Sequence, residues 1–284
     1  MFIYVILLHK RTLNAGKAEK VVFMSIIYTP KGKAREYSPY AANLYSGCNH
    51  GCKYCYAPGI VRKKRDEYID VVQRRNVIRD FEKDCEKMAG LQSQVLFCFM
   101  TDPYNVIETD KKITRWCLNI ALKNKIPISI LTKSKLVLRD IDLFKKFAGN
   151  INVGMTLTMD NEKDSCIWEP NAATPEERLK ALKALKDNGI KTWASFEPVI
   201  DTQQSLNMIK RSVAFVDLYK IGKLNNYKGL DKIINWNQFL IDSVEIVRNN
   251  NKNLYVKHDL RTFANGFKLY GNETNQDEFT LSWN

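Results

Sequence analysis

The sequence has no apolar run long enough to cross a membrane. The apolar segment near its start, from Phe2 to Leu8, falls far short of the ~20 residues that a membrane-spanning helix needs, and no basic segment precedes it. Internal repeats and low-complexity tracts are also missing. These absences give no support for membrane insertion or export. They favour one main domain in a chain of 284 residues that is 45% hydrophobic.

A disulfide framework is missing as well. The seven cysteines are odd in number and unevenly spaced, unlike those of a small secreted protein, so we expect a reducing compartment, the cytoplasm. Met24 stands just before a plausible second beginning of the chain. Residues 1–23 are therefore interpreted as an N-terminal extension, with an added first strand as the alternative. The main domain is assigned to residues 24–270 and a polar tail to residues 271–284.

Acidic residues are outnumbered by basic ones. Lysine and arginine together number 44 and aspartate and glutamate 31, so the net charge is 44 − 31 = +13 and the isoelectric point is near 9.3. Such a charge attracts polyanions, which makes nucleic acid a candidate partner. The alternative is an ordinary solvated surface, because only Arg62 to Arg65 form a tight basic run.

The most informative segment is NLYSGCNHGCKYCYAP at residues 43–58. A C-x3-C-x2-C triplet can place three thiolates around one inorganic centre, and the glycines let the backbone approach that centre closely. A [4Fe-4S] cluster normally takes four cysteines, so this loop either needs a distant ligand or leaves one iron open for a substrate or cofactor. The three cysteines are Cys48, Cys52 and Cys55.

Strand and helix patterns alternate along the rest of the chain. Strands are predicted at residues 42–45, 94–100, 127–132, 152–158, 191–196, 215–221 and 254–257. Helices are predicted at residues 66–88, 108–124, 138–147, 175–188, 203–211 and 231–249, and Thr174 followed by Pro175 is typical of a helix start. About six strand-helix units and a seventh strand indicate an α/β fold with parallel strands. Both an open doubly wound sheet and a full or partial barrel fit this pattern.

Polar side chains follow the predicted strands where each strand ends. In parallel α/β folds ligands bind at the carboxyl ends of the strands, so these residues are expected to face one mouth. They are Thr101, Asp102, Thr132, Lys133, Ser134, Thr156, Thr158, Glu197, Lys220 and Lys223.

The cysteine loop resembles the C-x3-C-x-Φ-C signature of radical S-adenosylmethionine (SAM) enzymes, with Tyr54 as the aromatic residue Φ. Further segments are similar to the spore photoproduct lyase-like group, also called DNA repair photolyase-like. These are TDPY at residues 101–104, TKSKLVLRD at 132–140, EP at 169–170, EPVID at 197–201 and IGKLN at 221–225. The resemblance runs from Met24 to Asp259 and implies a partial (β/α)6 barrel of the TIM type.

The resemblance also implies the cofactors and their chemistry. Three cysteines hold three irons of a [4Fe-4S] cluster, and the fourth iron binds SAM. An electron from an external donor such as flavodoxin or ferredoxin cleaves SAM to methionine and a 5′-deoxyadenosyl radical, which abstracts hydrogen from a substrate, with nucleic acid as the candidate. The cofactor carries the difficult step. The cofactor-binding residues implied are Tyr54, Thr101, Asp102, Lys133, Thr156 and Glu197.

Each assignment has a simpler alternative. The cysteines with His50 form a Cys3His set that could hold structural zinc. Lys133 could be a solvated lysine, and Thr156 a residue that merely favours strands. Asp102, Glu169 and Glu197 could cap helices or pair with lysines. The corresponding alternative function is a non-catalytic iron-sulfur or zinc protein that binds nucleic acid or senses redox state.

The remaining cysteines raise the question of a hydrogen donor. Cys85 and Cys117 fall in predicted helices and Cys98 in a predicted strand, where a free cysteine usually acts as a small hydrophobic residue. Spore photoproduct lyase itself uses a cysteine near the end of this strand to return hydrogen to its product. Cys98 lies one residue from that place, and in a strand a one-residue shift reverses the face. Cys166 is therefore the alternative donor.

Overall fold

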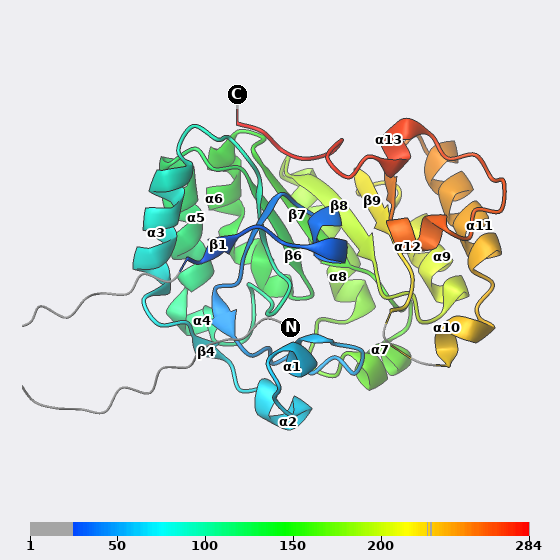
Figure 1. The fold of residues 1–284 in the computed structure, drawn as a ribbon, viewed down its shortest axis with the longest axis horizontal. Helices are drawn as coiled ribbons and strands as arrows, with labels where there is room; N and C mark the ends of the chain where they lie inside the picture. The colour runs from blue at the N-terminus through cyan, green and yellow to red at the C-terminus, as the bar shows by residue number, and fades with distance from the viewer. Residues whose placement is uncertain (1–24, 226, 228, 284) are drawn as a thin grey trace, which may run out of the picture.

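The computed structural model describes residues 25–225, 227 and 229–283. The predicted N-terminal extension lies outside these residues. Eight strands form the main sheet, in the spatial order β1-β2-β5-β6-β7-β8-β9-β10 (Figure 1). Their bounds are β1 (Ile27–Tyr28), β2 (Tyr40–Ala42), β5 (Val95–Phe97), β6 (Ile128–Thr132), β7 (Ile151–Thr156), β8 (Lys191–Phe196), β9 (Leu218–Ile221) and β10 (Asn253–Val256).

The strand order distinguishes between the two architectures that the sequence left open. From β2 to β10 every strand pairs in parallel with the strand that follows it in the sheet, and the spatial order follows the chain order without reversal. A doubly wound sheet reverses its strand order at a switch point, which puts helices on both faces. Right-handed crossovers that all run one way put the helices on one face and leave the other face as an interior. The predicted partial barrel is confirmed.

Helices cover the outer face of this sheet. They are α3 (Val77–Met88), α5 (Ile113–Lys123), α6 (Ile141–Phe144), α8 (Pro175–Asp187), α9 (Thr202–Ser212) and α11 (Trp236–Asn249). The shorter helices α4 (Glu108–Lys111), α7 (Glu162–Trp168), α10 (Leu230–Ile233), α12 (His258–Arg261) and α13 (Gly271–Thr274) lie in the segments that connect or follow these elements. Thr174 caps α8, as predicted, by accepting a 3.2 Å hydrogen bond from the Glu177 amide. No helix within the described residues is both long and apolar enough to span a membrane.

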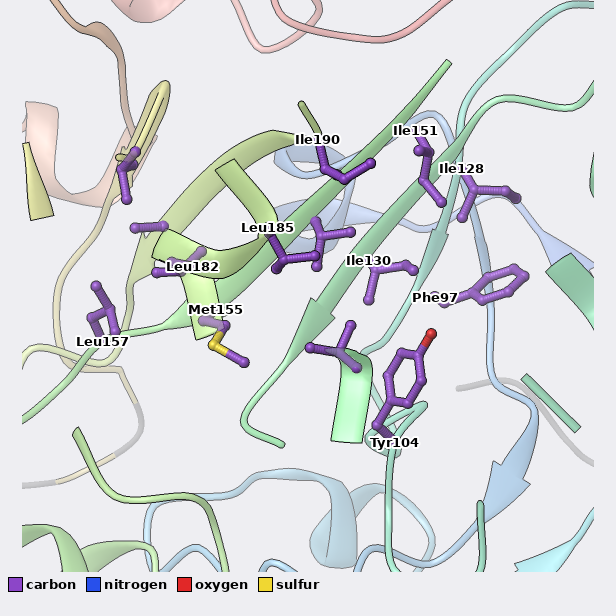
Figure 2. Packing of buried hydrophobic residues seen from close by; sticks show 14 of the residues in the cluster. Phe97, Tyr104, Ile128, Ile130, Ile151, Met155, Leu157, Leu182, Leu185 and Ile190 are labelled. Carbon is purple, nitrogen blue, oxygen red and sulfur yellow. The ribbon is translucent and has the colours of Figure 1, made fainter. Parts of the chain in front are cut away.

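The main core lies between the sheet and these helices. Alternate strand residues such as Ile130 and Met155 face Leu182 and Leu185 of α8 (Figure 2). Each fully buried side chain of this kind contributes about 1.5–3 kcal/mol through the area it removes from water. The opposite strand residues form a smaller interior cluster that includes Leu96, Leu131 and Trp193.

Several predicted elements are shorter or interrupted in the structure, and two of them lie next to the cysteine loop or the strand ends. The helix predicted at residues 66–88 is interrupted: α2 (Arg65–Tyr68) is followed by β4 (Val72–Gln73) before α3 begins. The interruption arises because β4 pairs with β3 (Tyr45–Ser46) in a second, two-stranded sheet, and Asn76 takes a left-handed conformation before α3. The strand predicted at residues 94–100 ends at Phe97.

The C-terminal segment packs against the barrel. Arg248 forms an ion pair with Glu273 at 2.7 Å, and Arg35 forms one with Asp277 at 2.8 Å. Beyond them, Phe279 packs on the interior cluster. These contacts bring the tail across the molecule from α13 to the β5 side, where Ser282 bridges to Ser93.

Candidate functional site

A cavity of about 400 Å³ opens at the carboxyl ends of the strands. Nine of the ten residues selected from the sequence as ligands, cofactor contacts or hydrogen donor line it; Cys166 does not. The nine are Cys48, Cys52, Cys55, Tyr54, Thr101, Asp102, Lys133, Thr156 and Glu197. Of the other strand-end residues, Thr132 lines the cavity, whereas Ser134, Thr158, Lys220 and Lys223 do not.

The cysteine loop connects β3 to α1 (Ala57–Ile60) and is held at its first glycine. Gly47 has φ +85°, and a Cβ there would lie 2.3 Å from the carbonyl oxygen of Asp70. The Gly47 carbonyl accepts a 2.6 Å hydrogen bond from the Thr101 hydroxyl, and the next amide, of Cys48, donates to the Tyr68 carbonyl at 2.8 Å. Only glycine permits this close backbone packing.

Arg65 holds the second half of the loop. Its guanidinium donates to the carbonyl of Cys52 at 2.9 Å and to the carbonyl of Cys55 at 2.8 Å. Because a guanidinium is planar and rigid, these two bonds fix the spacing of both cysteine carbonyls. On the other side of the loop, the amide of Lys53 donates to the Trp168 carbonyl at 2.9 Å.

The three thiols line the same cavity. Burial raises the pKa of Cys48 to about 12 and that of Cys52 to about 11, which means that neither thiol ionises readily without a bound cation. No three His, Cys, Asp or Glu side chains in the described part of the chain converge on a single metal ion. A four-iron cluster needs a different arrangement from a single metal ion. Each thiolate binds its own iron, so the three thiols must be spaced around the cluster and need not converge on one point. Three thiols on one glycine-containing loop beside a cavity fit that arrangement.

Asp102 organises the strand ends rather than pointing freely into the cavity. Its carboxylate accepts hydrogen bonds from the Thr132 hydroxyl at 2.7 Å, the Lys133 amide at 2.8 Å and the Tyr104 amide at 2.8 Å. His50 Nδ1 lies 3.5 Å from the same carboxylate, and burial lowers the pKa of His50. The carboxylate therefore fixes the backbone from which the Lys133 side chain reaches the cavity.

Lys133 lies beside the aromatic residue of the cysteine signature. Its ammonium is 5.7 Å from the centre of the Tyr54 ring, and the Tyr54 hydroxyl donates to Glu169. Glu169 and Arg178 are each 1% exposed and form an ion pair behind this ring. Burial raises the pKa of Glu169, but Arg178 and Lys133 outweigh it, so the pKa is lowered and the carboxylate stays charged.

A group of polar side chains around Glu197 also lines the cavity. Glu197 accepts hydrogen bonds from the Tyr37 hydroxyl at 2.7 Å and from the Asn225 amide at 2.9 Å, and it forms an ion pair with Lys257. The Tyr37 hydroxyl also lies 3.0 Å from the Ser195 hydroxyl. Glu197 is thus held by this group, as its alternative interpretation predicted, and it lines the cavity at the same time.

Sequence reasoning did not select Tyr37 or Lys257. Lys257 follows β10, so the rule that polar residues gather at strand ends could have found it. Tyr37 comes after the 3-10 helix η1 (Gly32–Glu36), in a segment for which the sequence predicted neither a strand nor a helix. No sequence pattern pointed to Tyr37, because its place in the cavity depends on how η1 packs over the barrel.

A comparison of the sequence with known protein families identifies the family. The Radical SAM superfamily matches residues 42–216, which is more than half of the chain. The chain belongs to the radical SAM superfamily. Proteins of this family use SAM together with an iron-sulfur cluster, so the predicted resemblance is confirmed.

Two sequence relatives of this radical SAM protein show how widely the domain occurs. The uncharacterised protein MJ0683 of Methanocaldococcus jannaschii is 35% identical over 191 residues, which cover 66% of this chain and 70% of the relative. The uncharacterised protein Rv2578c of Mycobacterium tuberculosis is 26% identical over 192 residues, covering 62% of this chain and 55% of the relative.

Solved radical SAM structures share the fold. A spore photoproduct lyase mutant with bound SAM and dinucleoside spore photoproduct matches with a TM-score of 0.52 and 15% identity, covering 71% of this chain and 61% of the lyase. SuiB of Streptococcus suis bound to SAM matches with a TM-score of 0.60 and 14% identity, covering 81% of this chain and 53% of SuiB. This chain therefore spans between about half and two thirds of these two solved chains.

The two candidate thiols of this radical SAM protein occupy different places. Cys166 lies on α7 and is exposed. Cys98 lines the cavity, so the expectation that a one-residue shift turns it to the opposite face was wrong. Cys98 lies two residues after Leu96 of the interior cluster, so alternation along the strand turns Cys98 inward. Counting back from Thr101 missed this, because β5 ends at Phe97 and Phe99 has φ +97°, a left-handed conformation that is rare for a bulky residue, so the segment between Phe97 and Thr101 is not a regular strand. Phe99 itself also lines the cavity.

Proposed function

We propose that this protein is a radical SAM enzyme in which Cys48, Cys52 and Cys55 hold a [4Fe-4S] cluster. The observation that supports this most is that the three thiols and Lys133 line one cavity at the carboxyl ends of parallel strands. Bound there, the cluster and SAM supply one-electron cleavage of the sulfonium and a 5′-deoxyadenosyl radical. The protein's own part is to position both groups and the substrate.

Lys133 is proposed to bind the carboxylate of SAM. Its ammonium lies over Tyr54 and beside the loop, and a lysine is a point charge with three donors for such a group. Tyr54 packs beside the adenine in this proposal, and Thr156, which is buried and lines the cavity, offers a hydroxyl. Thr101 and Asp102 support the cofactor indirectly, since their hydrogen bonds go to the loop and the strand ends.

The substrate is proposed to bind at the end of the cavity away from the cysteine loop. Tyr37, Asn225 and Lys257 supply polar groups there around Glu197. Nucleic acid remains our candidate substrate, supported by the net charge of +13, and the lyase-like chemistry is proposed with it. Binding of labelled DNA and RNA should weaken steeply as salt rises, and salt-insensitive binding would instead point to a peptide or small molecule.

We assign the return of hydrogen to the product to Cys98 in place of Cys166. Cys98 lines the cavity, whereas Cys166 is exposed on α7 and does not line it. Cys98→Ala should leave SAM cleavage intact and change the product distribution. Cys166→Ala is the matched control and should behave as the wild type; the reverse pattern would restore the earlier assignment.

The experiment that tests the whole proposal is anaerobic reconstitution with iron and sulfide. The reduced protein should contain about four irons per chain and convert SAM to 5′-deoxyadenosine. Cys52→Ala should lose both properties, whereas Cys85→Ala, which removes a buried thiol on α3, should keep them. Stoichiometric zinc without iron, or an intact cluster without cleavage, would refute the proposal.

An oxygen-sensitive cluster and seven free cysteines also support the proposed location in a reducing cytoplasm.

A further inference from the structure

Residues 60–69, except for the buried Tyr68, form an exposed surface on the outside of the cysteine loop. Ile60, Val61 and Ile69 are 67%, 44% and 42% exposed, which is unusual for three aliphatic residues so close in sequence. The basic run Arg62, Lys63 and Lys64 lies between them and is exposed as well. Among the described residues, no ion pair or hydrogen bond of these three side chains to a carboxylate is found. The segment also carries the exposed acidic residues Asp66 and Glu67, so its four basic and two acidic residues give a net charge of 4 − 2 = +2. Apolar and positive groups are therefore both available to a partner.

This surface is tied directly to the proposed cluster ligands. The residue after the run, Arg65, donates to the Cys52 and Cys55 carbonyls, and Tyr68 accepts from the Cys48 amide. None of residues 60–69 lines the cavity. In Figure 1, α1 and α2 lie together at the lower edge of the view, apart from the outer helices α9 and α11. The inside of the loop thus faces the cavity, and its outside carries residues 60–69.

We propose that residues 60–69 are the docking surface for an acidic protein that carries electrons singly. This inference rests on the proposed function, which needs one electron per SAM cleaved. In the step, the carrier loses one electron and the cluster gains it; no proton or group is transferred. Electron-transfer contacts are typically small, below about 1,200 Å² in total, so a surface of this extent suits the task.

Charge complementarity selects the acidic carrier. A positive surface accelerates encounter with a negative partner by roughly 10- to 1,000-fold, and such steering weakens as salt rises. A nucleic acid would also respond to the charge. However, a substrate must reach the cavity, and residues 60–69 do not line it, whereas an electron carrier needs only to approach the outside of the ligand loop.

The test uses the full-length reconstituted enzyme and a reduced flavodoxin. One variant reverses the charge of the surface through Arg62→Glu, Lys63→Glu and Lys64→Glu. A control variant makes the same change in net charge at three exposed lysines on the outer helical side of the barrel, through Lys146→Glu, Lys180→Glu and Lys210→Glu. Flavodoxin binding is measured as a function of salt, and 5′-deoxyadenosine formation is measured with flavodoxin and, separately, with dithionite.

The surface variant should bind flavodoxin at least about tenfold more weakly at low salt and lose flavodoxin-driven cleavage by a similar factor, while dithionite-driven cleavage stays unchanged. The control variant should stay within about twofold of the wild type in all three measurements. Equal behaviour of the two variants overturns the inference, as does a surface variant that loses DNA or RNA binding but keeps flavodoxin binding. A wild type that binds flavodoxin through this surface but never cleaves SAM overturns the proposed function instead.

Discussion

The sharpest structural prediction concerns the two glycines of the cysteine segment, Gly47 and Gly51, and Gly59, which directly follows the segment. An alanine at Gly47 must adopt φ +85°, and its Cβ would lie 2.3 Å from the Asp70 carbonyl oxygen and 2.9 Å from that of Tyr68. The left-handed conformation costs about 1–2 kcal/mol, and forcing a methyl group against backbone that cannot move costs about 1–3 kcal/mol more. Gly47→Ala should therefore destabilise the protein by about 3 kcal/mol.

Gly51 and Gly59 provide a graded comparison. Gly51 has φ +66° but only an ordinary contact, 3.4 Å, at its Cβ position, so Gly51→Ala should cost about 1 kcal/mol. A Cβ at Gly59, in α1, would meet nothing within 4 Å, and Gly59→Ala should be neutral or stabilise by about 0.5 kcal/mol.

Urea unfolding of the metal-free proteins measures this series, and iron content after reconstitution shows whether the loop still binds a cluster. The expected order of stability is Gly59→Ala above Gly51→Ala above Gly47→Ala, with iron binding lost at Gly47→Ala. If Gly47→Ala unfolds at the same urea concentration as Gly59→Ala, the loop is not held as described and the reasoning fails.

Three further predictions concern residues deeper in the fold. Arg178→Met should cost about 3–5 kcal/mol, because it leaves the Glu169 carboxylate buried without its partner, and a double-mutant cycle with Glu169→Gln should show strong coupling between the two; additive effects would contradict this. Gly154→Ala should lower the melting temperature, because its Cβ would lie 2.2 Å from the Trp193 ring, and an unchanged melting temperature would contradict that packing. Lys220 should make stability depend on pH. Burial, and to a lesser extent the charge of Lys257, lower its pKa from 10.5 to about 7, so the unfolded chain binds more protons between these values and stability should rise across that range. Unfolding measured from pH 7 to 10 should lose this contribution to the slope in Lys220→Met, and an identical slope would refute it.

The sequence predicted the parts of the site that depend on short-range pattern. The cysteine spacing marked the loop, and the strand-end rule selected Asp102, Lys133 and Glu197, which all line the cavity. These predictions succeed because the carboxyl ends of parallel strands meet at one edge, so a residue's place in its own strand is enough to locate it.

The parts that failed depend on contacts between distant segments. The predicted helix at residues 66–88 is broken because β4 pairs with β3. This pairing joins segments that precede and follow the cysteine loop, so the local sequence of either segment does not predict it. The face of Cys98 was mispredicted because counting back from Thr101 assumes a regular strand, and no local sequence pattern predicts that β5 ends at Phe97 or that Phe99 is left-handed. Arg178 is equally hidden in the sequence: it lies in an amphipathic helix, where an arginine is normally expected at the surface.

The central claim is that the cysteine loop leaves one iron free to bind SAM. The measurement that tests it most directly is electron paramagnetic resonance of the one-electron-reduced, reconstituted protein, with SAM carrying 15N in its amino group. The account predicts a hyperfine coupling between the cluster spin and this nitrogen, retained in Gly59→Ala and absent from Cys52→Ala. An intact reduced cluster that shows no coupling to bound SAM would contradict it.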